Sequence, residues 1–196
     1  MKSNRILVVV ALPQEISKSK WGDRPTLIYT GIGKINTCIA LIAAINTYKP
    51  NMIINLGSAG AINHRLSGVV EVNQVIERDI DLSPLAVRGE IPYEQTKNRF
   101  MSKFKGVKCA SGDTFVTNRD SWLIENNVDI VDMELVAIAK ICHKKGISWR
   151  SFKYITDYVG KHNSLQWEST VNLSTKTLID TFDKKFIKNN SVNLDL

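Results

Sequence analysis

Residues 52–61 read Met-Ile-Ile-Asn-Leu-Gly-Ser-Ala-Gly-Ala, and this stretch decides the class of fold. Its first half, Met52–Leu56, is apolar enough to form a buried strand. The part from Asn55 to Ala61 is rich in small residues, which let a backbone approach a ligand closely at the carboxyl end of a sheet. The pattern predicts a buried strand followed by a turn that faces a ligand.

A helix is predicted before this stretch, between Lys34 and Tyr48, and Pro50 prevents it from continuing. Its apolar residues recur at helical spacing, at Ile35, Cys38, Ile39, Ile42 and Ile45. A first glycine turn, Thr30-Gly31-Ile32-Gly33, precedes the helix, so its N–H groups could face an anion or a hydroxyl-rich ligand. The turn lacks the spacing of a Walker A loop and the third glycine of a dinucleotide fingerprint.

Short apolar runs alternate with helical segments along the rest of the chain, which is typical of an α/β domain with a largely parallel central sheet. The predicted strands are Arg5–Ala11, Thr26–Tyr29, Met52–Leu56, Gly68–Ile76, Val107–Ala110, Asp129–Asp132 and Trp149–Thr156. Further helices are predicted over Met133–Lys145 and about Trp167–Phe186. We expect one domain over residues 1–187 and a frayed tail over 188–196.

The segment Glu77–Thr96 does not fit this alternation, because it holds two prolines, several charges and no clear period. A loop of that length inside a compact domain is usually functional or part of an interface.

Composition narrows the class of protein. The chain has 196 residues, 43% hydrophobic and 23% charged, as an ordinary globular domain has, and no apolar run long enough for a membrane span. Its three cysteines, Cys38, Cys109 and Cys142, lack the spacing of a zinc site, so we expect core positions, no metal and a cytoplasmic location. The net charge is +7, but the lysines are dispersed without interleaved aromatic residues, which favours a solvated basic surface over a nucleic-acid site.

Three carboxylates stand at the ends of predicted strands. Glu15 follows the first predicted strand, and Glu134 follows the strand Asp129–Asp132 where a helix begins. Asp157 stands at the end of the strand Trp149–Thr156. Each has an ordinary structural explanation, as a charge at a helix N-terminus or as an N-cap. Together they could also converge on one cleft.

Seven segments, in their order and spacing, resemble the 5′-methylthioadenosine/S-adenosylhomocysteine nucleosidases of the nucleoside phosphorylase/hydrolase superfamily. They are Ala11–Glu15, Gly31–Lys34, Gly57–Gly60, Arg78–Leu82, Ser111–Phe115, Asp132–Glu134 with Ala137–Ala139, and Ile155–Asp157. The resemblance covers roughly Arg5 to Phe186 and implies a three-layer fold, with a central mixed, largely parallel sheet flanked by helices. It also implies hydrolysis, without a cofactor, of the N-glycosidic bond of an adenine nucleoside of the 5′-methylthioadenosine, S-adenosylhomocysteine or 5′-deoxyadenosine type.

The resemblance also implies roles for individual residues. Asp157 would be the general acid that protonates purine N7, with its pKa raised by burial, and Glu15 the base that orients and deprotonates water. Glu134 would accept hydrogen bonds from the ribose hydroxyls. The other implied substrate contacts are Met133, Ser58, Ile32 and Gly60 around the sugar, Phe115 and Val116 at the base, Trp167 closing the pocket, and Leu82 and Leu85 at the 5′-substituent. The 78–93 segment would also form a homodimer contact. Without the resemblance, Phe115, Met133 and Trp167 would be assigned to the core.

The chain departs from the family in several places, and three of them bear directly on the site. The stretch between Glu15 and Gly31 lacks a pair of strands that typical members carry, so part of the sheet should be missing and the pocket more open. Lys153 stands where an arginine is usual, which keeps the charge but not the fork of donors. Arg78 occupies a position where a small, neutral polar or histidine residue is expected.

Two other functions stay open. A phosphorylase of the same fold would use Lys34 or Arg65, although neither glycine turn contains an arginine and Glu15 would repel phosphate. The other is a catalytically weak protein that binds nucleosides or nucleic acid, which the shortened N-terminal region and the basic surface favour.

Overall fold

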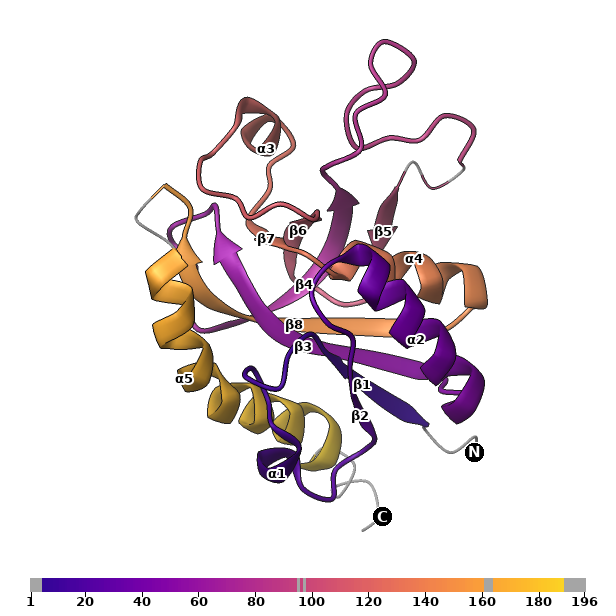
Figure 1. Cartoon of the computed structure of the whole chain (residues 1–196), viewed down its shortest axis with the longest axis vertical. Helices are drawn as coiled ribbons and strands as arrows, with labels where there is room; N and C mark the ends of the chain where they lie inside the picture. Colours follow the sequence, from indigo (N-terminus) through magenta and orange to yellow (C-terminus); the bar gives the residue numbers. More distant parts are fainter. Residues whose placement is uncertain (1–4, 95, 97, 161–163, 189–196) are drawn as a thin grey trace.

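All seven predicted strands form, and together with one more they make a single sheet (Figure 1). The computed structural model describes residues 5–94, 96, 98–160 and 164–188, and between 164 and 172 it describes side chains only at position 170. The strands are β1 (Ile6–Val10), β2 (Leu27–Tyr29), β3 (Met52–Ala61), β4 (Val69–Glu77), β5 (Arg99–Met101), β6 (Val107–Ser111), β7 (Ile130–Asp132) and β8 (Ser148–Tyr158). The sequence did not predict β5, which is three residues long.

The sheet is mixed and largely parallel, as the sequence predicts. Parallel pairs join β1 to β2 and β3, β3 to β8, β4 to β6, and β6 to β7. Antiparallel pairs join β3 to β7 and β4 to β5 and β8. The pairings from β3 through β8, β4, β6 and β7 return to β3, so these strands close into a ring, and β1 and β2 extend from it.

Helices cover both sides of the sheet. On one side, α2 (Lys34–Tyr48) and α4 (Leu135–Lys145) lie next to each other, and α5 (Ser164–Phe182) covers the other side and runs into a π-helical turn, Asp183–Ile187 (Figure 1). The short helices α1 (Lys18–Trp21) and α3 (Ser121–Glu125) complete the fold. Residues of β1 point alternately into the two cores, Leu7 and Val9 under α2 and α4, and Val8 and Val10 under α5. Burial on both faces explains why the strands read as continuous apolar runs.

Two strands, β3 and β8, extend further than the sequence predicts. The Asn55–Ala61 stretch was expected to contain a turn, but β3 continues to Ala61 because its last residues pair with β7 and β8. Asp157 was expected at the end of its strand, whereas β8 continues to Tyr158. Both strands therefore pass through the site instead of stopping beside it.

Most of the apolar stripe that predicted α2 does not face the core. Ile35 is 73% exposed and Ile39 67% exposed, and Ile42 is exposed as well. Of the predicted stripe only Ile45 is buried, and the helix packs against the sheet and α4 with Thr37, Leu41, Ala44 and Ile45. The helical period of the apolar residues predicted the helix correctly. In the single chain, however, Ile35, Ile39 and Ile42 of this stripe lie on the surface.

The remaining expectations concern the ends and the irregular segment. The chain between β4 and β5 is without regular helix or strand where the structure describes it, in agreement with the prediction for Glu77–Thr96. The expected tail lies outside the described residues except for Lys188. None of the helices described is both long and apolar enough to cross a bilayer.

Candidate active site

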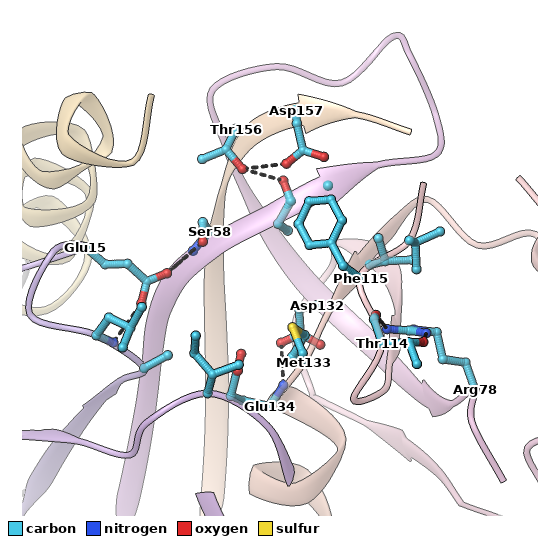
Figure 2. Close-up of a pocket in the computed structure, with 17 residues that line it drawn as sticks. Glu15, Ser58, Arg78, Thr114, Phe115, Asp132, Met133, Glu134, Thr156 and Asp157 are labelled. Atoms are coloured by element: carbon cyan, nitrogen blue, oxygen red, sulfur yellow. Dashed lines mark hydrogen bonds between the residues drawn. The ribbon is translucent and has the colours of Figure 1, made fainter. Parts of the chain in front are cut away.

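The carboxyl ends of six strands surround one cavity of about 180 Å³ (Figure 2). Its lining comes from or just after β1, β3, β4, β6, β7 and β8, where α/β sheets bind small molecules, and Ile32 is added from the turn between β2 and α2. The lining residues are Ala11, Leu12, Glu15, Ile32, Ser58, Ala59, Gly60, Arg78, Thr114, Phe115, Val116, Val131, Asp132, Met133, Glu134, Thr156 and Asp157. Residues 16–30 contribute nothing to its lining.

Most of the expected site residues meet here, although they come from distant parts of the chain. The cavity brings together Glu15, Ile32, Ser58, Gly60, Phe115, Val116, Met133, Glu134 and Asp157. Leu82 and Leu85 are exposed and do not line it; Leu85 is 83% exposed. Trp167 belongs to α5, but its side chain lies outside the described residues.

Glu15 is buried and held by three donors. Its Oε1 accepts hydrogen bonds from Ser58 N at 2.7 Å and Ser58 Oγ at 2.8 Å, and its Oε2 accepts one from Leu12 N at 3.2 Å. Its backbone carbonyl accepts from Thr175 Oγ1 at 2.7 Å, so α5 fixes the turn that carries it. A carboxylate held in one rotamer is suited to orienting a water molecule.

Asp157 lies on β8, on another side of the cavity (Figure 2). Burial raises the pKa of its carboxyl group, against a 2.8 Å hydrogen bond that it accepts from Thr156 Oγ1. A Cβ at Gly60 would stand 3.0 Å from Asp157 Oδ2, so a glycine on β3 makes room for this carboxyl group. A buried carboxyl with a raised pKa is suited to donating a proton.

Glu134 is the third carboxyl group and lies at the N-terminus of α4. Its Oε1 accepts a hydrogen bond from Gly33 N at 3.0 Å, which ties the first glycine turn to the site. Burial, and after it the charge of Asp132, raise the pKa of Glu134 to about 7.

A buried ion pair lies beside this group. Lys153 Nζ and Asp132 Oδ2 are 2.8 Å apart, and both side chains are almost wholly buried. Burial opposes both charges, yet Lys153 holds the pKa of Asp132 below its usual range, and Asp132 raises that of Lys153. Asp132 also accepts hydrogen bonds from Leu135 N at 3.0 Å and from Ser111 Oγ, so the pair fixes the start of α4. Lys153, which replaces the arginine usual in the family, thus helps through Asp132 to fix the N-terminus of α4, where Glu134 lies.

Apolar side chains form the rest of the cavity. Figure 2 shows the Phe115 ring projecting into the space between Asp157 and Met133. Phe115 is 48% exposed, so it is a rim residue and not a core residue. A flat ring that is half exposed beside an apolar cavity offers a stacking surface to a planar ligand.

The cations near the cavity already have carboxylate partners. Lys34 Nζ lies 2.8 Å from Glu77 Oε1, and Arg78 Nη1 lies 3.0 Å from Asp79 Oδ1. At the N-terminus of α2, Lys34 N donates to Asp113 Oδ1 at 2.7 Å, beside the Gly33 bond to Glu134. A phosphate dianion at this turn would meet carboxylates where it needs free donors. In the described part of the chain no group of acidic, histidine and cysteine residues is arranged to hold a metal ion.

The sequence interpretation did not assign eight of the lining residues to this site, and four of these are polar: Arg78, Thr114, Asp132 and Thr156. Three of them stand next to a residue that it did assign, namely Phe115, Met133 and Asp157. Adjacency to an assigned residue was the signal that could have found them.

Glu134→Gln is expected to stabilise the protein at pH 8 and much less at pH 4. A carboxyl group whose pKa is raised by folding stabilises the fold below its ordinary pKa, and that contribution is lost as pH rises through the folded value. The rise from 4.5 to about 7 corresponds to on the order of 3 kcal/mol at most. Urea unfolding at the two pH values measures the difference. Glu125→Gln, on an exposed helix residue, is the control, and an equal effect of Glu134→Gln at both pH values would contradict the assignment.

Comparisons with known proteins agree with this architecture. A family model described as the phosphorylase superfamily matches residues 13–184. A 5′-methylthioadenosine/S-adenosylhomocysteine nucleosidase of Buchnera aphidicola subsp. Schizaphis graminum is 29% identical over 191 residues, covering 85% of this chain and 81% of the relative.

Two solved structures share the fold. The 5′-methylthioadenosine/S-adenosylhomocysteine nucleosidase of Helicobacter pylori, with butyl-thio-DADMe-Immucillin-A, has a TM-score of 0.83 at 18% identity, covering 94% of this chain and 98% of that one. The futalosine hydrolase of Helicobacter pylori strain 26695 has a TM-score of 0.82 at 19% identity, covering 91% and 95%.

Proposed function

Because the chain belongs to the phosphorylase superfamily, we propose that it hydrolyses the N-glycosidic bond of an adenine nucleoside to adenine and the free sugar. The observation that carries the proposal is the pair of buried carboxyl groups on different sides of one apolar cavity (Figure 2). Asp157 has the raised pKa of an acid, and Glu15 has the fixed geometry of a group that orients water. The catalytic unit is a single domain over residues 1–187.

The reaction divides between these groups as follows. Asp157 donates its proton to purine N7, so the C1′–N9 bond breaks and adenine leaves as a neutral molecule. Positive charge develops at C1′ and the ring oxygen, and Glu134 accepts hydrogen bonds from the ribose hydroxyls and holds the sugar in place. A water molecule on Glu15 adds to C1′ and gives its proton to Glu15. Phe115 and Val116 contact the base, and Ser58, Met133, Ile32 and Gly60 surround the sugar.

Water is favoured over phosphate as the nucleophile. Lys34 and Arg78 are neutralised by carboxylates, and Arg65 is exposed and does not line the cavity. We expect the same rate of adenine release in phosphate-free buffer and in phosphate, with the free sugar as the only sugar product. Chromatography of the products decides this. A sugar 1-phosphate, formed at a rate that depends on phosphate, would establish the phosphorylase instead.

A 5′-alkylthio group is the substituent that fits best. Ala11, Leu12 and Ile32 are apolar parts of the lining, and the curated relative named above is a nucleosidase of such substrates. Leu82 and Leu85 lie outside the cavity in one chain, so they contact the substituent only if a second chain presents them.

A homodimer is the proposed assembly, in the cytoplasm. Its interface would combine the exposed stripe of α2, at Ile35, Ile39 and Ile42, with the 78–93 segment, where Leu85, Val87 and Tyr93 are exposed. Ile32 lines the cavity one turn from this stripe, so the interface would continue to the mouth of the pocket. Exposed apolar side chains grouped in this way are typical of a protein–protein contact.

Ile39→Glu is expected to convert the dimer to a monomer, because it places a charge in the centre of the apolar stripe. Light scattering after gel filtration measures the mass. The control is Ile124→Glu, on α3, where the side chain is 60% exposed outside the stripe. A parent protein that is already monomeric, or a variant that stays dimeric, would contradict the interface.

A further inference from the structure

The loop that carries Phe115 has almost no support from its own backbone. Residues 112–117 lie between β6 and α3 without regular structure. One backbone–backbone hydrogen bond lies at each end, Gly112 N to Asp132 O and Gly160 N to Thr117 O, both 3.1 Å, and no other joins these residues to the described part of the chain. Thr114, Phe115 and Val116 nevertheless line the cavity. Side chains must therefore hold Gly112–Val116, named here the base loop.

Arg78 holds the base loop from the end of β4. Its Nη1 donates to Thr114 Oγ1 at 2.8 Å, and its Nη2 donates to Gly112 O at 2.9 Å and also to Thr114 O. The side chain is 3% exposed, and its backbone N–H donates to Ser111 O at 3.0 Å. One guanidinium group thus binds the loop at Gly112 and at Thr114, the residue before Phe115.

Asp79 completes the attachment. It accepts from Arg78 Nη1 at 3.0 Å and from the backbone N–H of Asp113, the loop residue between the two that Arg78 binds. A side chain at Gly112 would collide with the Asp79 carboxylate, so the loop can close onto the pair only with a glycine there. The planar fork of an arginine satisfies several acceptors at fixed angles, which the ammonium group of a lysine cannot do.

We propose that Arg78, with Asp79, is a positioning residue that fixes the base loop and thereby sets the affinity of the site for adenine. The inference rests on the proposed function. Asp157 and Glu15 lie on β8 and after β1, and neither is attached to the base loop. Loss of the Arg78 contacts therefore weakens binding of the base more than it slows the chemical step.

Arg78→Lys tests the inference, with Arg150→Lys as a matched control. Arg150 is partly buried and also donates two hydrogen bonds from its guanidinium group, of 2.8 and 3.0 Å to Glu71, but it does not line the cavity. In Arg78→Lys, the KM for 5′-methylthioadenosine and the Kd for adenine are expected to rise about tenfold, while kcat falls by less than about threefold. The pH profile of kcat should not change, and Arg150→Lys should bind adenine like the parent.

Thr114→Val is the second variant, in case Arg78→Lys fails to fold. It removes one acceptor of the guanidinium group and keeps the shape of the side chain, so the Kd for adenine should rise about threefold. Unchanged Kd and KM in folded variants, or a loss confined to kcat, would overturn the positioning role while leaving the proposed function intact. A parent protein that neither binds adenine nor releases it from nucleosides would instead refute the proposed function, and this inference with it.

Discussion

Replacing Asp157 by asparagine is expected to lower kcat for adenine release by about a thousandfold or more, within the range that general acid catalysis supplies. The amide keeps the shape of the side chain but cannot deliver a proton to N7, so the base would have to leave as an anion. Adenine affinity should fall much less than kcat, because the amide NH₂ can still donate a hydrogen bond to N7 and the Phe115 stacking surface is untouched. Release of adenine by single-turnover assay and calorimetric titration with adenine separate the two effects.

Asp183→Asn is the control for this prediction. Its carboxylate forms an ion pair with Arg24, 2.7 Å from Nε, and it lies in the π-helical turn after α5, outside the lining of the cavity. The control should retain the kcat of the parent. If Asp157→Asn kept kcat within about tenfold of the parent, another group would have to protonate the base.

Replacing Glu15 by glutamine is expected to lower kcat by about a hundredfold or more. The amide cannot take the proton of the attacking water. Its NH₂ group would also face either the two Ser58 donors or the Leu12 N–H, because the carboxylate accepts from both sides. Adenine binding should survive, since Glu15 does not contact the base in the proposed reaction.

Two further variants separate the base role of Glu15 from a structural one. Ser58→Ala removes the 2.8 Å hydrogen bond from Ser58 Oγ to Glu15 Oε1, so it should lose about tenfold in kcat. Glu15→Ala leaves a space in which added formate can stand in for the carboxylate and restore part of kcat. A Glu15→Gln variant as active as the parent would remove Glu15 from the chemical step.

The sequence predicted most elements because both faces of the sheet are buried, which makes the strands apolar and leaves the intervening helices periodic. It could not predict how β3 ends. A Cβ at Gly57 would stand 3.0 Å from Glu15 Oε1, and one at Gly60 would stand 3.0 Å from Asp157 Oδ2. These glycines resemble turn residues in the sequence, but they lie in an extended strand because two carboxyl groups need the space.

The sequence also could not assign the apolar stripe of α2 or the partners of the buried cations. A helical period is the same whether the face meets the core or another chain, and Ile35 and Ile39 proved to be exposed. Lys153 and Arg78 were visible as departures from the family. Their partners, Asp132 and Thr114, lie 21 and 36 positions away and meet them only through the ring of strands, which no local pattern encodes.

The most direct test of the central claim is the release of adenine from 5′-methylthioadenosine by the purified parent protein in phosphate-free buffer. Adenine should accumulate in a one-to-one ratio with the nucleoside consumed. The same assay with S-adenosylhomocysteine and 5′-deoxyadenosine defines the 5′-substituent. A folded protein that releases no adenine from any of the three nucleosides, with or without phosphate, would contradict the account.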